Sequence, residues 1–453
     1  MEKLSGVYAK FITTLAYEDV TPEVREHVKK LILDYVGVTL AGYHLMEFPK
    51  TVVRYVSDLG GLPEATIFHV GTKVPAIHAA FANAACGHAL DLDDGHRFAA
   101  LHPGTVTIPA AFAAAEMTGA PMRRLVSGIL IGYELMIRIS MAINPSSLNR
   151  GFHPTGMVGQ FGAAAAAAHI MGLGYEETVG ALGLAGLSLP GLMQCNHEEG
   201  AAHSKPITPA RAAQEGLLSC VLAQRGVRGP EAIFEGVDGY LKAVTDKVTP
   251  DVLTADLGRD FKTMGCYIKL YSACRHAHAP VDAAVGAFKR AGIDVNDISE
   301  IVVETYPVAL RLAGIAHPGS SSAGRFSIPF SIALALIKGE AGATQYSIEN
   351  ISDPKIQELT GKVRLVASPH WEELYPKQRG ATVTIVDHQG RRWNFSAPLA
   401  KGEPENPVEW DELYGKFLRN ATLLISEARA RDLADAIMMI EKKTSLNRIF
   451  ALT

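Results

Sequence analysis

The sequence predicts a mainly α-helical protein with a large all-α helical domain and a smaller α+β lid domain. Apolar residues recur at helical spacing, within Ala-rich segments, over most of the first 264 residues and again after residue 405. Between residues 265 and 404, segments of alternating apolar and polar residues, typical of strands, separate the helical segments. We therefore expect a discontinuous helical domain, 1–264 and 405–453, interrupted by a lid domain at 265–404.

The overall charge favours a small molecule as the ligand. The net charge is −4, and no cluster of basic residues stands out, whereas nucleic acids and anionic membranes call for a basic face. The longest apolar segments, near 125–137 and 161–173, are shorter than the ~20 residues that a spanning helix needs. We expect neither a nucleic-acid partner nor a membrane.

The cysteines and the N-terminus indicate a cytoplasmic protein. The five cysteines are scattered and form no C-x-x-C pair, which argues against a disulfide framework and an iron–sulfur site. The first residues mix charged and apolar side chains and do not resemble a secretory signal. Reduced thiols in the cytoplasm fit this pattern best.

The N-terminal half reads as consecutive helices. Thr21, Pro22 and Glu23 form a start signal, and apolar spacing then continues to Gly42. Small residues dominate 75–90, which predicts a buried central helix. Further helices are expected over 105–119 and 125–143, the second carrying Glu134 and Arg138 four residues apart, a spacing that usually stabilises a helix.

The glycine-rich segment 151–169 is not a phosphate loop. It matches neither G-x-x-x-x-G-K-[ST] nor G-x-G-x-x-G. Glycines three residues apart at 156, 159 and 162, repeated at 180, 183 and 186, instead predict close helix packing. His153 precedes the helix expected here, where a free N-terminus favours an anion such as a carboxylate; a loop histidine bonded to the backbone is the alternative.

After residue 261 the sequence pattern changes from consecutive helices to a mixture of helices and strands. We expect helices over 281–290 and 328–337, strands over 300–306 and 362–367, and a hairpin joining 381–386 to 393–397. A Pro-rich polar linker, 401–407, leads to two more amphipathic helices over 409–424 and 427–442. These last helices should rejoin the first domain.

The stretch 87–104, G-H-A-L-D-L-D-D-G-H-R-F-A-A-L-H-P-G, is the strongest functional signal. Titratable side chains next to apolar, core-like sequence are costly to remove from water unless they form ion pairs or take part in chemistry. We therefore expect this stretch to form one wall of an active site. If the preceding helix continues to about Asp94, Asp91 and Asp94 lie near its C-terminus, which raises a carboxyl pKa. Asp93 and Asp94 could equally form a solvated turn ending at Gly95.

Metal-dependent alternatives find little support in the spacing. The D-D-x-x-D pattern of terpene and prenyl synthases is missing, and neither H-E-x-x-H nor a regular His/Asp ligand spacing occurs. We expect no metal and no cofactor.

Lys205, in a loop before the helix expected near Pro209, can hold a carboxylate, although a lone lysine is usually a surface group. The segment 266–282 adds Lys269, Cys274, Arg275, His276 and His278.

Four ordered blocks resemble the MmgE/PrpD superfamily. They are H-A-L-D-L-D-D-G-H…H-P-G, G-F-H-P-T-G…F-G-A-A-A-A-A, S-K-P…A-R-A-A-Q-E-G and K-L-Y-S-A-C-R-H-A-H-A-P-V-D-A, and together they span nearly the whole chain. The superfamily includes 2-methylcitrate dehydratase, cis-aconitate decarboxylase and iminodisuccinate epimerase. The resemblance implies a helical domain built from both chain ends, an α+β lid, a homodimer, and cofactor-independent chemistry on small di- or tricarboxylates.

The resemblance also implies which residues line the site. Asp91, His102, His153, Lys205 and Lys269 match positions of the family's active site. Two features depart from its decarboxylases: Cys274 stands where they have a histidine, and their lid tyrosine has no counterpart unless His317 replaces it. Together with the residues flagged above, the expected catalytic set is Asp91, His102, Lys205, Lys269, Cys274, His276 and His278, and the expected substrate-binding set is His153, Lys205, Lys269, Arg275 and His96.

The expected reaction begins with removal of a proton α to a carboxylate. Our first hypothesis is a hydro-lyase (dehydratase) acting on a hydroxylated di- or tricarboxylic acid. An epimerase or isomerase of a similar acid is the second hypothesis, and a cis-aconitate-type decarboxylase is a further alternative. A member that binds carboxylates without catalysis is the non-enzyme alternative.

Overall fold

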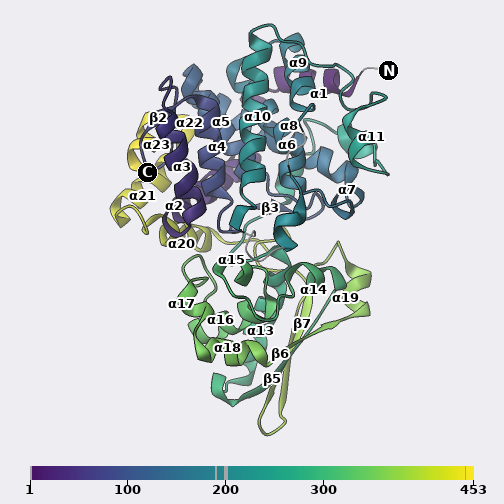
Figure 1. Ribbon diagram of the computed structural model, residues 1–453, viewed down its shortest axis with the longest axis vertical. Helices are drawn as coiled ribbons and strands as arrows, with labels where there is room; N and C mark the ends of the chain where they lie inside the picture. Colours follow the sequence, from purple (N-terminus) through teal and green to yellow (C-terminus); the bar gives the residue numbers. More distant parts are fainter. Residues whose placement is uncertain (1–2, 189–190, 198–202, 444) are drawn as a thin grey trace.

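The computed structural model describes residues 3–188, 191–197, 203–443 and 445–453. It confirms a mainly α-helical protein, with a large helical lobe that contains both chain ends and a smaller lobe built on a β-sheet (Figure 1). Two main hydrophobic cores correspond to these lobes. One draws its buried residues from 8–268 and 413–449, and the other from 273–400. The domain boundaries at 264/265 and 404/405 stay a prediction.

Helices account for most of the larger lobe. Its elements are α1 (Leu4–Thr14), α2 (Pro22–Leu45), α3 (Glu47–Leu59), α4 (Ala76–Gly87), α5 (Gly104–Thr118), α6 (Met122–Ile143), α7 (Ser146–Asn149), α8 (Pro154–Met171), α9 (Tyr175–Ala185), α10 (Ile207–Gln224), α11 (Tyr240–Val244), α12 (Asp251–Thr254), α20 (Trp410–Ala421), α21 (Glu427–Met438), α22 (Ile440–Lys443) and α23 (Leu446–Leu452), with a short hairpin of β1 (Ala65–Thr66) and β2 (Lys73–Val74). The C-terminal helices, yellow in Figure 1, pack against α2, as expected from the linker before them.

The predicted start of α2 is confirmed in atomic detail. The hydroxyl of Thr21 accepts a hydrogen bond from the backbone N–H of Val24 at 3.4 Å, and Pro22 occupies the first helical position. The helix runs to Leu45, three residues beyond the expected end at Gly42.

Helix α6 is longer and more apolar than the sequence suggested. By length and composition alone it could cross a membrane, but 94% of its most apolar window is buried inside the protein, as in a core helix. Its Glu134 and Arg138 are both fully buried and form an ion pair at 3.1 Å. The guanidinium of Arg138 also donates to the backbone carbonyls of Val252 and Ala255, so the pair fastens α6 to the segment after α12.

The smaller lobe contains a four-stranded sheet in the order β6-β5-β7-β8. Strands β5 (Ile298–Thr305) and β6 (Val363–Ala367) are parallel, whereas β7 (Ala381–Asp387) is antiparallel to β5 and forms the predicted hairpin with β8 (Arg392–Ala397). The lobe's helices are α13 (His278–Ala291), α14 (Pro307–Ala313), α15 (Ser321–Gly324), α16 (Ile328–Lys338), α17 (Ile348–Ile351), α18 (Pro354–Gly361) and α19 (Pro369–Leu374). A two-residue pair, β3 (Gly95–His96) with β4 (Cys266–Tyr267), lies where the chain enters this lobe.

The expectation that α4 continues to about Asp94 is wrong. The helix ends at Gly87, and Asp91 adopts a φ of 48°, in the left-handed region that an α-helix of L-residues cannot contain. The segment 88–94 is therefore a buried irregular loop between α4 and β3, and its side chains do not share one helix face.

The glycine ridges on α8 and α9 do allow close packing, as predicted. A Cβ on Gly159 would lie 2.9 Å from the Cβ of Ala212, and one on Gly183 would lie 2.7 Å from backbone atoms of Gly229 and Pro230. Gly180, one turn earlier on α9, has no neighbour of this kind nearer than 3.6 Å. The helices therefore pack closely at Gly159 and Gly183 and more loosely at Gly180.

Gly183→Ala should destabilise the protein by about 1 to 3 kcal/mol, because the new methyl group meets backbone that cannot rotate away. Gly180→Ala is the matched control in the same helix and should be neutral or stabilise by up to about 1 kcal/mol through helix propensity. Urea unfolding of both variants measures the difference. Equal stability of the two variants would contradict the packing role of Gly183.

Candidate active site

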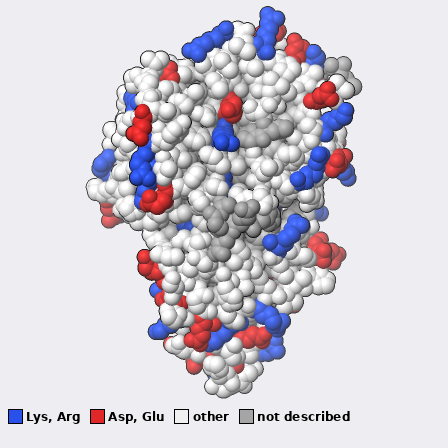
Figure 2. Space-filling view, viewed as in Figure 1, with Lys and Arg blue, Asp and Glu red and all other residues white. Residues whose placement is uncertain are grey.

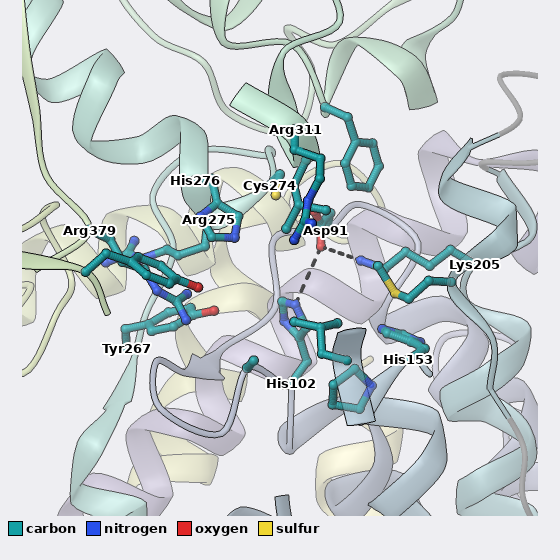
Figure 3. Close-up of a pocket in the computed structure, with 17 residues that line it drawn as sticks. Asp91, His102, His153, Lys205, Tyr267, Cys274, Arg275, His276, Arg311 and Arg379 are labelled. Atoms are coloured by element: carbon teal, nitrogen blue, oxygen red, sulfur yellow. Dashed lines mark hydrogen bonds and ion pairs between the residues drawn. The ribbon is translucent and has the colours of Figure 1, made fainter. Parts of the chain in front are cut away.

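A pocket lies where the two lobes meet, and residues of both lobes line it. Such a concave site between two lobes is a typical place for a small-molecule ligand. Figure 3 shows the polar side chains converging on it. The predicted site residues that line it are Asp91, His102, His153, Lys205, Cys274, Arg275 and His276.

Asp91 is the centre of the charged network. Its Oδ1 lies 3.0 Å from the ammonium of Lys205 and 3.3 Å from that of Lys269. All three side chains are buried, and Lys269 is entirely so. Two ammonium groups thus share one carboxylate in direct ion pairs. The sequence placed these residues in three separate motifs, and the structure brings them together.

The backbone around Asp91 is held by hydrogen bonds, just as its side chain is held by ion pairs. The carbonyl of Leu90 accepts from the Ser272 hydroxyl at 2.6 Å and from Arg325 Nε at 3.2 Å. The carbonyl of Asp91 accepts from Lys269 Nζ at 2.7 Å, and that of Leu92 from Lys416 Nζ at 3.0 Å. These donors come from the smaller lobe, from the chain entering it and from α20. Such contacts offset the cost of a left-handed aspartate, which is of order 1–3 kcal/mol.

The two lysines keep Asp91 ionised. Burial alone would raise the pKa of the Asp91 carboxyl, but Lys205 and Lys269 outweigh burial and hold that pKa well below its usual range. The expectation of a raised pKa at Asp91 is therefore wrong. Burial also opposes the charge on Lys205, yet Asp91 and Asp93 raise its pKa above the usual value. Lys269, which is more deeply buried, has its pKa lowered by desolvation.

His102 presents a basic nitrogen to this network. Its Nδ1 lies 2.8 Å from the backbone carbonyl of Asp94, which can only accept, so Nδ1 carries the proton of the neutral ring. Nε2 is then the unprotonated nitrogen, 3.8 Å from Asp91 Oδ1. Burial lowers the pKa of His102 to about 3, which keeps the ring neutral. A neutral imidazole with a free Nε2 is suited to accept a proton.

His153 lies at the start of α8, as predicted, on the other side of Lys205. Its Nδ1 is 2.6 Å from the hydroxyl of Thr208, and burial, followed by the charge of Lys205, lowers its pKa well below the usual range. A neutral His153 can donate or accept a hydrogen bond with a bound carboxylate without adding charge.

Three residues of the acid-rich loop could hold a metal ion. His88, Asp93 and His102 each offer a ligand atom, and these atoms lie within 4.8 Å of one another. The sequence spacing did not reveal this cluster. In this structure Asp93 Oδ2 lies 2.8 Å from His88 Nδ1, and His102 Nδ1 donates to the carbonyl of Asp94, so these atoms are already hydrogen-bonded within the protein.

Cys274 and His276 lie on the smaller-lobe side of the pocket. Burial raises the pKa of the Cys274 thiol, so the sulfur stays protonated. His276 Nδ1 lies 2.6 Å from the hydroxyl of Tyr306, and burial lowers its pKa well below the usual range. Arg275 lines the same wall, but its guanidinium is paired with Glu403 at 2.9 Å.

The structure does not bring every predicted residue into the pocket. His96 Nδ1 accepts from the N–H of Ala99, and His278 Nε2 lies 3.2 Å from the carbonyl of Ala273; neither ring lines the pocket. Their assignment to substrate is therefore not supported. His317, considered as a replacement for the lid tyrosine, is exposed and also outside the lining.

Asp93 and Asp94 are not a solvated turn, contrary to one expectation. Both are buried, and the carboxylate of Asp94 accepts from the N–H of Gly104 at 3.2 Å. Burial, together with Asp93 and Asp34, raises the pKa of Asp94 well above its usual range. Asp34 forms an ion pair with Lys416 of α20 at 2.5 Å. Helix α20 thus contributes a cation to the acidic cluster of Asp34, Asp93 and Asp94.

Sequence reasoning missed the residues of the smaller lobe that complete the pocket. Four that carry polar groups are Tyr267, Arg311, Tyr375 and Arg379. They come from strand β4, the end of α14 and the chain after α19, with no recurring spacing, so no local pattern distinguished them from surface residues. Tyr267 lies inside the segment 266–282, other polar residues of which were singled out from the sequence.

His102→Gln should make stability less dependent on pH. The folded-state pKa, about 3, lies below the ordinary value of 6.5, so the unfolded chain protonates first as the pH falls below 6.5. This ring therefore costs stability progressively between pH 6.5 and 3, by at most about 1.4 kcal/mol per pH unit, and costs nothing above that window.

Urea unfolding at pH 7.5, 6.0 and 5.0 tests this expectation. The His102→Gln variant should lose less stability on acidification than the wild type, whereas His44→Gln, at an exposed site on α2, should keep the wild-type slope. Identical slopes for all three proteins would show that His102 is not held neutral by the fold.

Comparisons with known proteins identify the family of this chain. Residues 7–253 match the MmgE/PrpD N-terminal domain, and residues 271–442 match the MmgE/PrpD C-terminal domain. The chain is 26% identical to a cis-aconitate decarboxylase of Aspergillus terreus, over 99% of this chain and 96% of the relative. It is 24% identical to the human cis-aconitate decarboxylase, over 97% of this chain and 92% of the relative.

A third relative has a different activity. The 2-methylcitrate dehydratase of Cupriavidus necator is 26% identical over 50% of this chain and 49% of its own length. These relatives are lyases, and both halves of the chain match the family's two domains. The chain therefore belongs to the MmgE/PrpD family.

Proposed function

We propose that this protein is a cofactor-independent lyase of the hydro-lyase type, acting on a small di- or tricarboxylic acid. One observation carries the proposal: a neutral imidazole with a free Nε2, His102, faces a carboxylate that two buried lysines share. That arrangement combines a base with fixed positive charge, which removal of a proton α to a carboxylate requires. The named relatives, a decarboxylase and a dehydratase, support the same class of reaction.

Lys205 supplies the positive charge. A substrate carboxylate next to Lys205 develops extra negative charge when its α-carbon loses a proton, and the Lys205 ammonium, which lines the pocket, stabilises that enediolate-like anion. Lys269 is fully buried and does not line the pocket, so it acts through Asp91, which it holds in place. His153, on the other side of Lys205, adds a neutral hydrogen-bonding group. These groups are fixed before substrate arrives, because Asp91 already holds both lysines.

His102 takes the proton through Nε2. The imidazolium that forms is stabilised by Asp91, 3.8 Å from Nε2, and by Asp93, 3.5 Å from Nδ1. The electron pair left on the α-carbon forms the double bond as the neighbouring C–O bond breaks. Cys274, whose raised pKa keeps its thiol protonated, gives a proton to the departing hydroxyl, and the proton on His102 then returns to the thiolate.

Decarboxylation of a cis-aconitate-like acid is the second candidate. It is favoured by the relatives that match almost the whole chain, which are cis-aconitate decarboxylases. In that reaction a C–C bond breaks to release carbon dioxide, and the protonated groups around the pocket return a proton to carbon. We further propose a homodimer, as the family resemblance implies, and a cytoplasmic location, which the scattered cysteines favour.

Incubating the purified protein with a panel of di- and tricarboxylic acids in deuterated water tests the reaction class. The panel should include hydroxylated acids and cis-aconitate, with products followed by proton NMR. A hydro-lyase forms an alkene from a hydroxy acid. Carbon dioxide release supports the decarboxylase instead, and exchange of the α-hydrogen for deuterium without an alkene indicates an epimerase. No turnover and no exchange with any acid would contradict the proposal.

Lys205→Ala should lower kcat/KM by about 100- to 1000-fold on any acid that the wild type converts, because the positive charge next to the developing anion is lost. Asp91 keeps Lys269 as its partner, so folding should be preserved. Lys242→Ala is the control: Lys242 is exposed and donates only to the carbonyl of Val237. Unchanged turnover in Lys205→Ala would remove Lys205 from the active site.

A further inference from the structure

Arg379 stands out at the end of the pocket opposite Lys205. Its side chain lines the pocket although the residue is only 8% exposed. One guanidinium nitrogen, Nη2, donates to the backbone carbonyl of Arg97, whereas the buried Nε has no hydrogen-bond partner. In the described part of the chain, no ion pair joins Arg379 to a carboxylate. A buried charge without a counter-ion is unfavourable unless a ligand supplies one.

The acidic residues nearby are already in use. Glu403 pairs with Arg275 at 2.9 Å and with Arg97 at 3.1 Å, and Glu405 pairs with Arg97 at 2.5 Å. Two carboxylates therefore serve two other guanidinium groups. Among the described residues, Arg379 therefore has no carboxylate as an ion-pair partner at this end of the pocket.

Aromatic side chains enclose this end. Tyr267 and Tyr375 line the pocket beside Arg379, and the ring of Tyr375 stacks on Tyr306 with centroids 4.7 Å apart. Tyr306 in turn lies against His276, its hydroxyl 2.6 Å from Nδ1. These rings exclude water, which strengthens the attraction between a guanidinium and an anion.

The two ends of the pocket are well separated. In Figure 3, Arg379 and Tyr267 lie on one side, Lys205 and His153 on the other, and Cys274 lies between them. Each end therefore offers a cationic group: Lys205, paired with Asp91, at one end, and Arg379 at the other.

We infer that Arg379 binds a second carboxylate of the substrate, at the end of the pocket opposite Lys205. This inference rests on the proposed function, because it takes the ligand to be a carboxylic acid held at the lysine end. It assigns a binding residue to the second carboxylate of the di- or tricarboxylic acid proposed above. A guanidinium can bind a carboxylate through two parallel hydrogen bonds, so an amide at that end should be rejected.

The test compares binding of two matched probes, succinate and its half-amide succinamate, by isothermal titration calorimetry. The wild type should bind succinate at least 10-fold more tightly. Arg379→Gln should reduce that ratio to near one, because a single carboxylate site remains. Arg379→Lys keeps the charge without the bidentate geometry and should give an intermediate ratio. Arg54→Gln, at an exposed site on α3, should keep the wild-type ratio.

The outcomes separate this inference from the proposed function. If the wild type binds both probes equally, the pocket holds one carboxylate only and the second site is wrong. If Arg379→Gln or Arg379→Lys is folded and keeps the full wild-type preference, a group other than Arg379 binds the second carboxylate and the inference is wrong. If the wild type binds neither probe, the carboxylate ligand itself is wrong, and the proposed function fails with the inference.

Discussion

The ion pairs between Asp91 and the two lysines are the interaction on which the site depends. Asp91 belongs to a loop of the helical lobe, Lys205 precedes α10, and Lys269 lies where the chain enters the smaller lobe. Three buried charges are stable together only because each has an opposite charge at contact distance. The Asp91–Lys269 pair also links the loop of the helical lobe to the chain that enters the smaller lobe.

The backbone contacts around Asp91 explain how a strained loop can serve as a rigid wall. Carbonyls of three consecutive residues accept hydrogen bonds from Ser272, Arg325, Lys269 and Lys416, which lie far apart in the sequence. Because these donors surround the loop, Asp91 keeps a left-handed conformation that few L-residues adopt. The carboxylate is thereby oriented before any ligand binds, which is what electrostatic catalysis requires.

Burial determines which groups of the pocket carry a charge. Imidazole rings at His102, His153 and His276 have lowered pKa values, so they act as neutral hydrogen-bonding or basic groups. Permanent positive charge is left to lysine and arginine side chains. A polycarboxylate entering this pocket meets fixed cations at its ends and neutral proton acceptors beside its reacting carbons.

By itself the sequence determined the helical class, the hairpin of the smaller lobe, the cap at Thr21 and the motifs that contain Asp91, His102, His153, Lys205 and Cys274. Those features depend on local spacing, caps and short motifs. Only the tertiary structure decided that α4 ends at Gly87, that the pKa of Asp91 is lowered, that His96 and His278 lie outside the pocket lining, and that Arg379 lies at the far end of the pocket. The reason is physical: a carboxyl pKa, a left-handed residue and an unpaired guanidinium are each set by groups brought close in space from distant parts of the chain.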